Sequence, residues 1–163
     1  MTSPKAAIVV RPATVQDMGH VGEILAQGFS NKFGVAFGRR VDRAPRVLAQ
    51  IGQLKLKRKI SALFIAEANE RPVGVIELAD RPEQSSDSWQ QLRIMRQEIG
   101  LLHTLRAAIE LLLLYEENPN DEDTAYICQI PMDAAFRGCG IGRKLLKQAE
   151  QWARVANKTW PCT

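Results

Sequence analysis

The sequence predicts a single α/β domain, with a mixed, mostly antiparallel sheet and flanking helices. Two β-prone runs are joined by a short polar turn. A later β-prone run leads through a glycine-rich loop into an amphipathic helix, and further helical patterns lie upstream. A chain of 163 residues has room for one domain with a sizeable core, which we expect to span residues 1–163.

The N-terminal elements follow from local pattern. Residues 6–10 form a short β-prone run, which the Arg-Pro pair after it is expected to end. Thr14 and Asp17 have the spacing of a helix-capping arrangement. Apolar residues then recur at helical spacing over residues 18–29, which predicts an amphipathic helix with one buried face.

A second helix and a hairpin follow. Apolar residues at helical spacing over 47–54 predict a helix that ends in the basic run 55–59, which we interpret as a solvated helix end. Residues 62–68 and 73–79 are β-prone, and the polar residues 69–72 between them predict a turn and hence an antiparallel hairpin.

The C-terminal half predicts three more elements. A long helical pattern covers residues 89–115, with a break expected near Gly100, and its regularly spaced apolar residues are interpreted as packing residues: Met95, Leu102, Leu105 and Leu112. A strand is expected over 124–132, and after the glycine-rich loop a helix runs to about residue 156.

The glycine-rich loop is the segment that carries chemistry. Its glycines let backbone amides approach a ligand closely, and the unpaired N–H groups of the following helical turn face a bound anion. Nearby basic side chains add positive charge, so a pyrophosphate is the natural ligand. The candidate cofactor-binding residues of this segment are Arg137, Gly138, Cys139, Gly140, Ile141, Gly142, Arg143 and Lys144.

Two other phosphate-binding motifs do not fit this loop. A P-loop needs a Gly-Lys pair followed by Ser or Thr, whereas Gly142 is followed by Arg, Lys and Leu. A dinucleotide fingerprint needs GxGxxG with an acidic residue about 20 positions on. The loop here reads GxGxG, and residues 157–159 at that distance are Asn, Lys and Thr.

The segment Arg-Gly-Cys-Gly-Ile-Gly, with Ile130 and Met132 on the strand before it, resembles the cofactor motif of the GNAT family of N-acetyltransferases. The order of elements before it is similar, and so is the opening at residues 11–17. The resemblance covers essentially the whole chain and implies the GNAT fold, with acetyl-CoA as cofactor.

The resemblance also implies roles. Backbone groups near Ile130 and Met132 would hold the pantetheine arm, and the amides of the loop would hold the pyrophosphate. A backbone N–H on this strand would polarise the thioester carbonyl while an amine of a small molecule or protein attacks it. No catalytic residue is assigned. Glu122 and Asp123 are the best placed candidates for a base, although a solvated loop is the favoured interpretation.

The sequence departs from the family after its last helix. Family members continue with a fifth strand, a helix and a hairpin that carry an Asn and a Tyr, whereas this chain ends at Thr163 and its only tyrosines are Tyr115 and Tyr126. We therefore expect a domain that lacks its C-terminal strands, and we hypothesise that a single-base frameshift, in the gene or in the sequencing read, produced the tail over residues 159–163. The last strand would then be an exposed sheet edge, through which the chain is expected to aggregate or form a homodimer.

Composition argues against several other classes of protein. A net charge of +4 is too small and too scattered for nucleic acid. No signal peptide or membrane-spanning stretch is present, and three cysteines without a CxxC pair give no zinc site, so we expect a cytoplasmic protein. Two alternatives to an active transferase stay open: an inactive CoA-binding remnant and an interaction protein.

Overall fold

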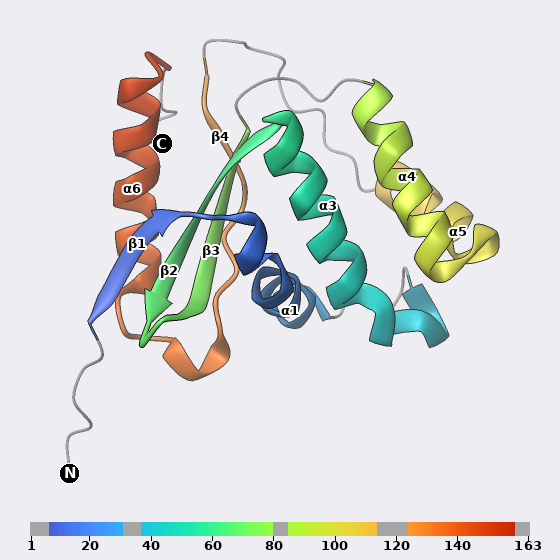
Figure 1. Ribbon diagram of the computed structural model, residues 1–163, viewed down its shortest axis with the longest axis horizontal. Coiled ribbons are helices and arrows are strands. Elements are labelled where there is room, and N and C mark those ends of the chain that lie inside the picture. The colour runs from blue at the N-terminus through green and yellow to red at the C-terminus, as the bar shows by residue number, and fades with distance from the viewer. Residues whose placement is uncertain (1–6, 31–36, 80–84, 114–123, 159–163) are drawn as a thin grey trace.

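The computed structural model describes residues 7–30, 37–79, 85–113 and 124–158. Its four strands form one fully antiparallel sheet in the order β1-β2-β3-β4, with α6 on one face and α1 and α3 on the other (Figure 1). The predicted α/β class and the predicted hairpin are confirmed. The strands are β1 (Ile8–Pro12), β2 (Ser61–Ala68), β3 (Arg71–Ala79) and β4 (Tyr126–Gln129), and the helices are α1 (Met18–Gly28), α3 (Ala44–Arg58), α4 (Ser85–Ile99), α5 (Leu101–Leu113) and α6 (Ile141–Val155).

Strand β1 extends past the point where the sequence predicted its end. The prediction that the Arg-Pro pair terminates it is wrong, because Arg11 and Pro12 pair with Ile65 and Phe64 of β2. β1 is an edge strand, where the missing N–H of proline removes no ladder bond. The β2–β3 turn is likewise shorter than expected: only Asn69 and Glu70 lie outside the strands, both with positive φ.

The predicted capping arrangement is present. The Asp17 carboxylate accepts hydrogen bonds from the main-chain N–H and the hydroxyl of Thr14, both at 2.7 Å, and the box caps a 3₁₀ turn (Val15–Asp17) that leads into α1. The Arg11 guanidinium bridges Asp17 at 2.9 Å and Glu67 at 2.6 Å. The bonds from Arg11 lower the pKa of Asp17 and, with those from Thr14, outweigh the effect of burial, so this carboxyl stays ionised.

Helices α1 and α3 pack closely against each other and cover one face of the sheet. Gly22 makes this approach possible, because a Cβ at that position would lie 2.2 Å from the Pro45 carbonyl oxygen. The apolar face predicted for α1 is confirmed as buried. The core on this side of the sheet consists of Met18, Val21, Ile24, Leu25, Leu63, Ile65 and Val75.

Helix α6 covers the opposite face. Gly74 of β3 lets it approach, since a Cβ there would lie 2.8 Å from Ile141 Cγ2 and 3.3 Å from Leu145 Cδ1. Of the apolar side predicted for this helix, Leu146 is exposed. The core between α6 and the sheet consists of Phe64, Ala66, Ala68, Val73, Ile76, Leu78, Ile141, Leu145 and Ala149.

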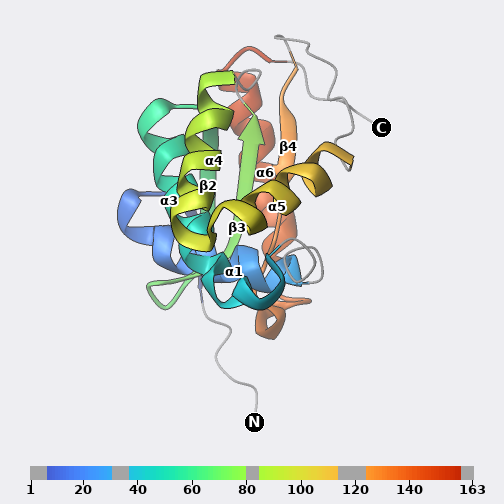
Figure 2. The ribbon, with the colours of Figure 1, turned by 90° about the vertical axis from the view of Figure 1, so that its right-hand side faces the viewer.

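The long helical pattern divides into two helices. The break lies at Gly100, whose φ of 82° is in the left-handed region, as the sequence predicted. α4 packs against α3. α5 passes behind α4 in Figure 1 and in front of the sheet in Figure 2. Met95 is buried as expected, but the packing role predicted for Leu102 and Leu105 is wrong, because they are 77% and 57% exposed. The side chain of Leu112 lies outside the described residues.

Strand β4 is shorter than the predicted run over 124–132. Its register shifts opposite Glu77 and Leu78, so Cys128 is an extra residue in a bulge. Pro131 has no N–H to donate, and beyond it only an isolated bridge joins Met132 to Gly74. The ladder therefore weakens where the chain turns toward α6. In the part of the chain that the structure describes, no helix is long and apolar enough to cross a membrane.

Candidate functional site

A short connection leads from β4 into α6. Asp133 starts it by accepting a hydrogen bond from the Ala135 N–H at 2.9 Å, which caps a 3₁₀ turn (Ala134–Phe136). Gly138 and Gly140 then adopt positive φ angles of 79° and 78°. Such angles are strained for other residues, so these glycines are needed for the loop to turn into α6 at Gly140, the residue that caps the helix.

The main-chain amides of this connection fall into two groups. The N–H groups of Arg137, Cys139 and Lys144 donate to carbonyls within the segment, at 3.2 to 3.3 Å. Within the described residues, the other five donate to no protein acceptor. We call these five the amide cradle: the N–H groups of Gly138, Gly140, Ile141, Gly142 and Arg143.

The side chains around the amide cradle have separate roles. Arg137, Cys139 and Arg143 are exposed. Ile141 is buried against Gly74, so its side chain anchors the helix while its amide belongs to the cradle. Lys144 directs its ammonium group to the Ile8 carbonyl of β1 at 2.7 Å, which ties the first turn of α6 to the sheet.

Ile130 and Met132 lie on the segment after β4, and their main-chain groups face away from β3. The Val75 N–H donates to the Pro131 carbonyl, and the Asp133 N–H donates to the Val73 carbonyl, each at 2.9 Å. Met132 is therefore a non-hydrogen-bonded position of the antiparallel pair, and by alternation so is Ile130. Their N–H and C=O groups lie on the outer edge of the sheet, next to the start of α6.

The donor set of the amide cradle fits an anion that presents several oxygens at once. Orphan N–H groups at a helix N-terminus, supported by the helix dipole, bind phosphate without any side-chain ligand. A diphosphate offers enough acceptor oxygens for five donors, and the outer edge at Ile130 and Met132 offers amide-binding groups beside it. These residues therefore fit the diphosphate and the pantetheine of coenzyme A.

Other candidates give no catalytic group. Cys139 is exposed and no described histidine is among its contacts, so nothing activates it as a nucleophile. Cys128 is exposed and is not part of the core. Glu122 and Asp123, the candidate bases, lie outside the described residues.

Sequence reasoning missed a buried charged network beside β4. Glu77 of β3 is 2% exposed, and its carboxylate accepts hydrogen bonds from Lys55 at 2.6 Å, from the Ser61 hydroxyl at 2.9 Å and from the Gln129 amide. Burial alone raises the pKa of Glu77, but the charge of Lys55 and the three hydrogen bonds lower it below its usual range. The carboxylate is therefore held ionised.

The basic run 55–59 is correspondingly more than a solvated helix end, which corrects that interpretation. Lys55 is committed to Glu77, and Arg58 pairs with the buried carboxylate of Asp87 on α4 at 2.5 Å. Both pairs cross between elements that are far apart in the sequence. Folding brings the partners of these charged residues close, so the sequence pattern alone could not identify them.

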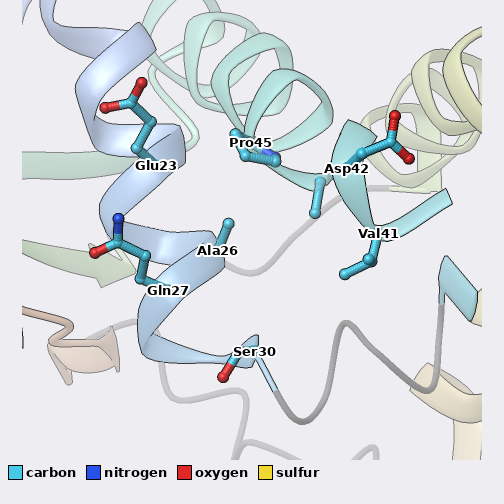
Figure 3. A pocket seen from close by; sticks show the side chains of 8 residues that line it. Glu23, Ala26, Gln27, Ser30, Val41, Asp42 and Pro45 are labelled. Carbon is cyan, nitrogen blue, oxygen red and sulfur yellow. The ribbon is translucent and has the colours of Figure 1, made fainter.

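A shallow pocket of about 270 Å³ opens between the C-terminal half of α1 and the start of α3 (Figure 3). Glu23 and Asp42 lie on opposite sides of it, with Gln27 on α1 and Ser30 beyond the end of that helix. The Asp42 carboxylate pairs with Arg43 at 3.4 Å. The same end of α1 approaches the segment after β4, because a Cβ at Gly28 would lie 2.9 Å from the Pro131 Cβ. The pocket is thus open and mostly apolar, and α1 links it to the segment after β4.

Solved structures share this fold. A histone acetyltransferase HPA2-related protein from Corynebacterium glutamicum is 21% identical, with a TM-score of 0.57 over 90% of this chain and 72% of its own. A predicted acetyltransferase from Clostridium acetobutylicum, solved with acetyl-CoA, is 17% identical, with a TM-score of 0.55 over 96% and 79%. An aminoglycoside N-acetyltransferase in complex with CoA is 13% identical, with a TM-score of 0.56 over 98% and 78%. None of the curated proteins matches the sequence.

A family model agrees with the fold. The model described as acetyltransferase (GNAT) family matches residues 29–160, which is most of the chain and includes β4, the amide cradle and α6. The resemblance noted from the glycine-rich loop is therefore confirmed. The chain belongs to the GNAT family of acetyltransferases.

Proposed function

We propose that the chain binds acetyl-CoA at the N-terminus of α6 and transfers the acetyl group to an amine. The observation that carries the proposal is the amide cradle, whose five N–H groups donate to no acceptor among the described residues. In the first turn of a helix these N–H groups have no intrahelical partner, and a diphosphate can accept hydrogen bonds from several of them at once. Arg137 and Arg143 would add charge at the rim of the same site.

The outer edge after β4 supports the orientation of the cofactor. Main-chain groups of Ile130 and Met132 face away from β3 and would hydrogen-bond the amides of a pantetheine arm, as a further strand would. With the diphosphate at α6, the arm would run back along the strand from Met132 toward Gln129. Its thioester end would then reach the region of the bulge at Cys128, where the β3–β4 register shifts.

Acetyl-CoA supplies an acyl group already activated as a thioester. The chain contributes position and polarity: a main-chain N–H of β4 donates to the thioester carbonyl oxygen, where negative charge develops as the neutral amine attacks. A C–N bond forms, the C–S bond breaks, and the proton lost by the amine offsets the one gained by the thiolate. We assign neither the base nor the acid to a residue.

The acceptor side is supported by the pocket between α1 and α3. Glu23, at the edge of this pocket, would attract an amine in its protonated, cationic form. We propose a small molecule or an exposed protein amine as acceptor. One of the structural neighbours is an aminoglycoside N-acetyltransferase, and aminoglycosides are polyamines. They are therefore the first acceptors to test.

The direct test is release of free thiol from acetyl-CoA. We expect release that depends on both the protein and an added primary amine, with one acetylated amine per thiol by mass spectrometry. CoA should also raise the melting temperature by about 5 to 10 °C at about 100 times its Kd. Binding without amine-dependent release would favour the inactive CoA-binding remnant, and absence of both would contradict the proposal.

Two alternatives have specific support. α5 exposes an apolar stripe that would suit an interaction protein: Leu101, Leu102, Leu105 and Ile109. The sheet order places β4 at an edge, which would suit a homodimer through that strand. A strand from a second copy would use the main-chain groups that we assign to pantetheine, so dimerisation and CoA binding would exclude each other. Among the described residues, Cys128 and Cys139 form no disulfide, which suits the proposed cytoplasmic location.

A further inference from the structure

The buried network around Glu77 joins four elements at one point. Lys55 comes from α3, Ser61 from β2 and Gln129 from β4, and each donates a hydrogen bond to the Glu77 carboxylate on β3. A carboxylate this deeply buried is costly unless it is fully paired. The network therefore fixes the relative positions of its four elements more tightly than apolar contacts would.

The β3–β4 register places this network beside the bulge of β4. Gln129 pairs directly with Glu77, and Ile127 pairs with Leu78, so Cys128 is bulged out immediately before the Gln129 contact. The hydrogen bond between the Gln129 and Glu77 side chains thus holds β4 at the residue that follows the bulge. One residue further on is Ile130, the first of the two edge positions assigned to the pantetheine arm.

We propose that Glu77 is a positioning residue for acetyl transfer: through Gln129 it sets the bulge of β4, and thereby the main-chain N–H that polarises the thioester carbonyl. Glu77 does not touch the substrate, because its carboxylate is buried under Lys55, Ser61 and Gln129. This inference rests on the proposed acetyl transfer. In this proposal, a single carboxylate outside the amide cradle aligns the thioester end of acetyl-CoA.

A purely structural role makes a different prediction. If the network served only stability, its disruption would change the fraction of folded protein and leave the turnover of folded molecules unchanged. A positioning role changes kcat while the diphosphate, held by α6, still binds. A displacement of about 1 Å at a reacting group costs about 100-fold in rate, so a smaller shift of β4 is expected to cost about tenfold.

The test uses a substitution and its reversal. Gln129→Glu places a second carboxylate against Glu77 and removes the donor, so we expect kcat to fall about tenfold while the Kd of CoA changes by less than about twofold. Adding Glu77→Gln removes the opposition of two carboxylates and restores a cross-strand bond, but it also takes from Lys55 its carboxylate partner. We therefore expect the double variant to recover only part of the lost kcat.

A matched control exists elsewhere in the chain. Gln50 of α3 donates to Glu98 of α4 at 2.7 Å, so Gln50→Glu creates the same opposition of carboxylates away from β4. We expect it to leave kcat unchanged. All variants are compared at temperatures where circular dichroism shows them folded.

The outcomes separate the inference from the function on which it rests. An unchanged kcat in Gln129→Glu, or an equal loss in Gln50→Glu, overturns the positioning role while acetyl transfer by the wild type stands. A wild type that releases no thiol overturns the proposed function itself, and the inference with it, before any variant is made.

Discussion

Gly22→Ala is expected to destabilise the fold by about 3 kcal/mol or more, the largest effect of any single methyl group added to α1. The new Cβ would lie 2.2 Å from the Pro45 carbonyl oxygen and 3.0 Å from the Ala49 nitrogen. Both are backbone atoms of α3, so no side-chain rotation relieves the contact. α1 and α3 must separate, and the core that they share with the sheet loosens.

Gly19 provides the matched control, because it lies on the same helix with nothing within 4 Å of an added Cβ. Gly19→Ala is expected to stabilise the protein by about 0.5 to 1 kcal/mol, since alanine loses less backbone entropy in a helix. Urea denaturation followed by circular dichroism measures both. Equal stabilities for the two variants would mean that α1 and α3 do not approach as described.

Gly142→Asp is expected to weaken CoA binding about 100-fold, or about 2.7 kcal/mol, without destabilising the protein. The new carboxylate would stand in the first turn of α6, among the amides of the cradle, and repel a diphosphate at close range. The same carboxylate is favourable for the helix itself, because it complements the dipole. Affinity and stability should therefore change in opposite directions.

Gly142→Ala separates charge from bulk. Its Cβ would lie 3.3 Å from Met132 Cε, the flexible end of a side chain that can move by a few tenths of an ångström. We expect the alanine variant to bind CoA within about threefold of wild type, while isothermal titration calorimetry shows the large loss only for aspartate. Equal losses for both would indicate that packing, and not an anion, governs this position.

Much of the fold was predictable because its signals are local. The glycine-rich loop, the helix after it and the hairpin depend on residues close together in the sequence, and the break at Gly100 follows from one left-handed residue. The candidate site was predictable for the same reason. Its proposed binding groups are main-chain amides, whose positions follow from glycine spacing and a helix start.

What could not be predicted depends on contacts between distant segments. The charge at Lys55 looked solvated because its partner, Glu77, lies 22 residues away on a strand whose burial is decided by α3. Leu102 and Leu105 have the spacing of core residues, but over residues 101–109 the buried side chains of α5 are those of Thr104 and Ala107. Periodicity identifies an apolar stripe, and only the tertiary fold determines whether anything covers it.

The most direct test of the account is a titration of ¹⁵N-labelled protein with CoA, followed by amide chemical shifts. We predict that the largest shifts fall on the five amides of the cradle, Gly138, Gly140, Ile141, Gly142 and Arg143, and on Ile130 and Met132 along the outer edge. Free phosphate at high concentration should move the first group alone. Shifts that spare the cradle, or that cluster on α4 and α5, would contradict the assignment of this helix start as the diphosphate site.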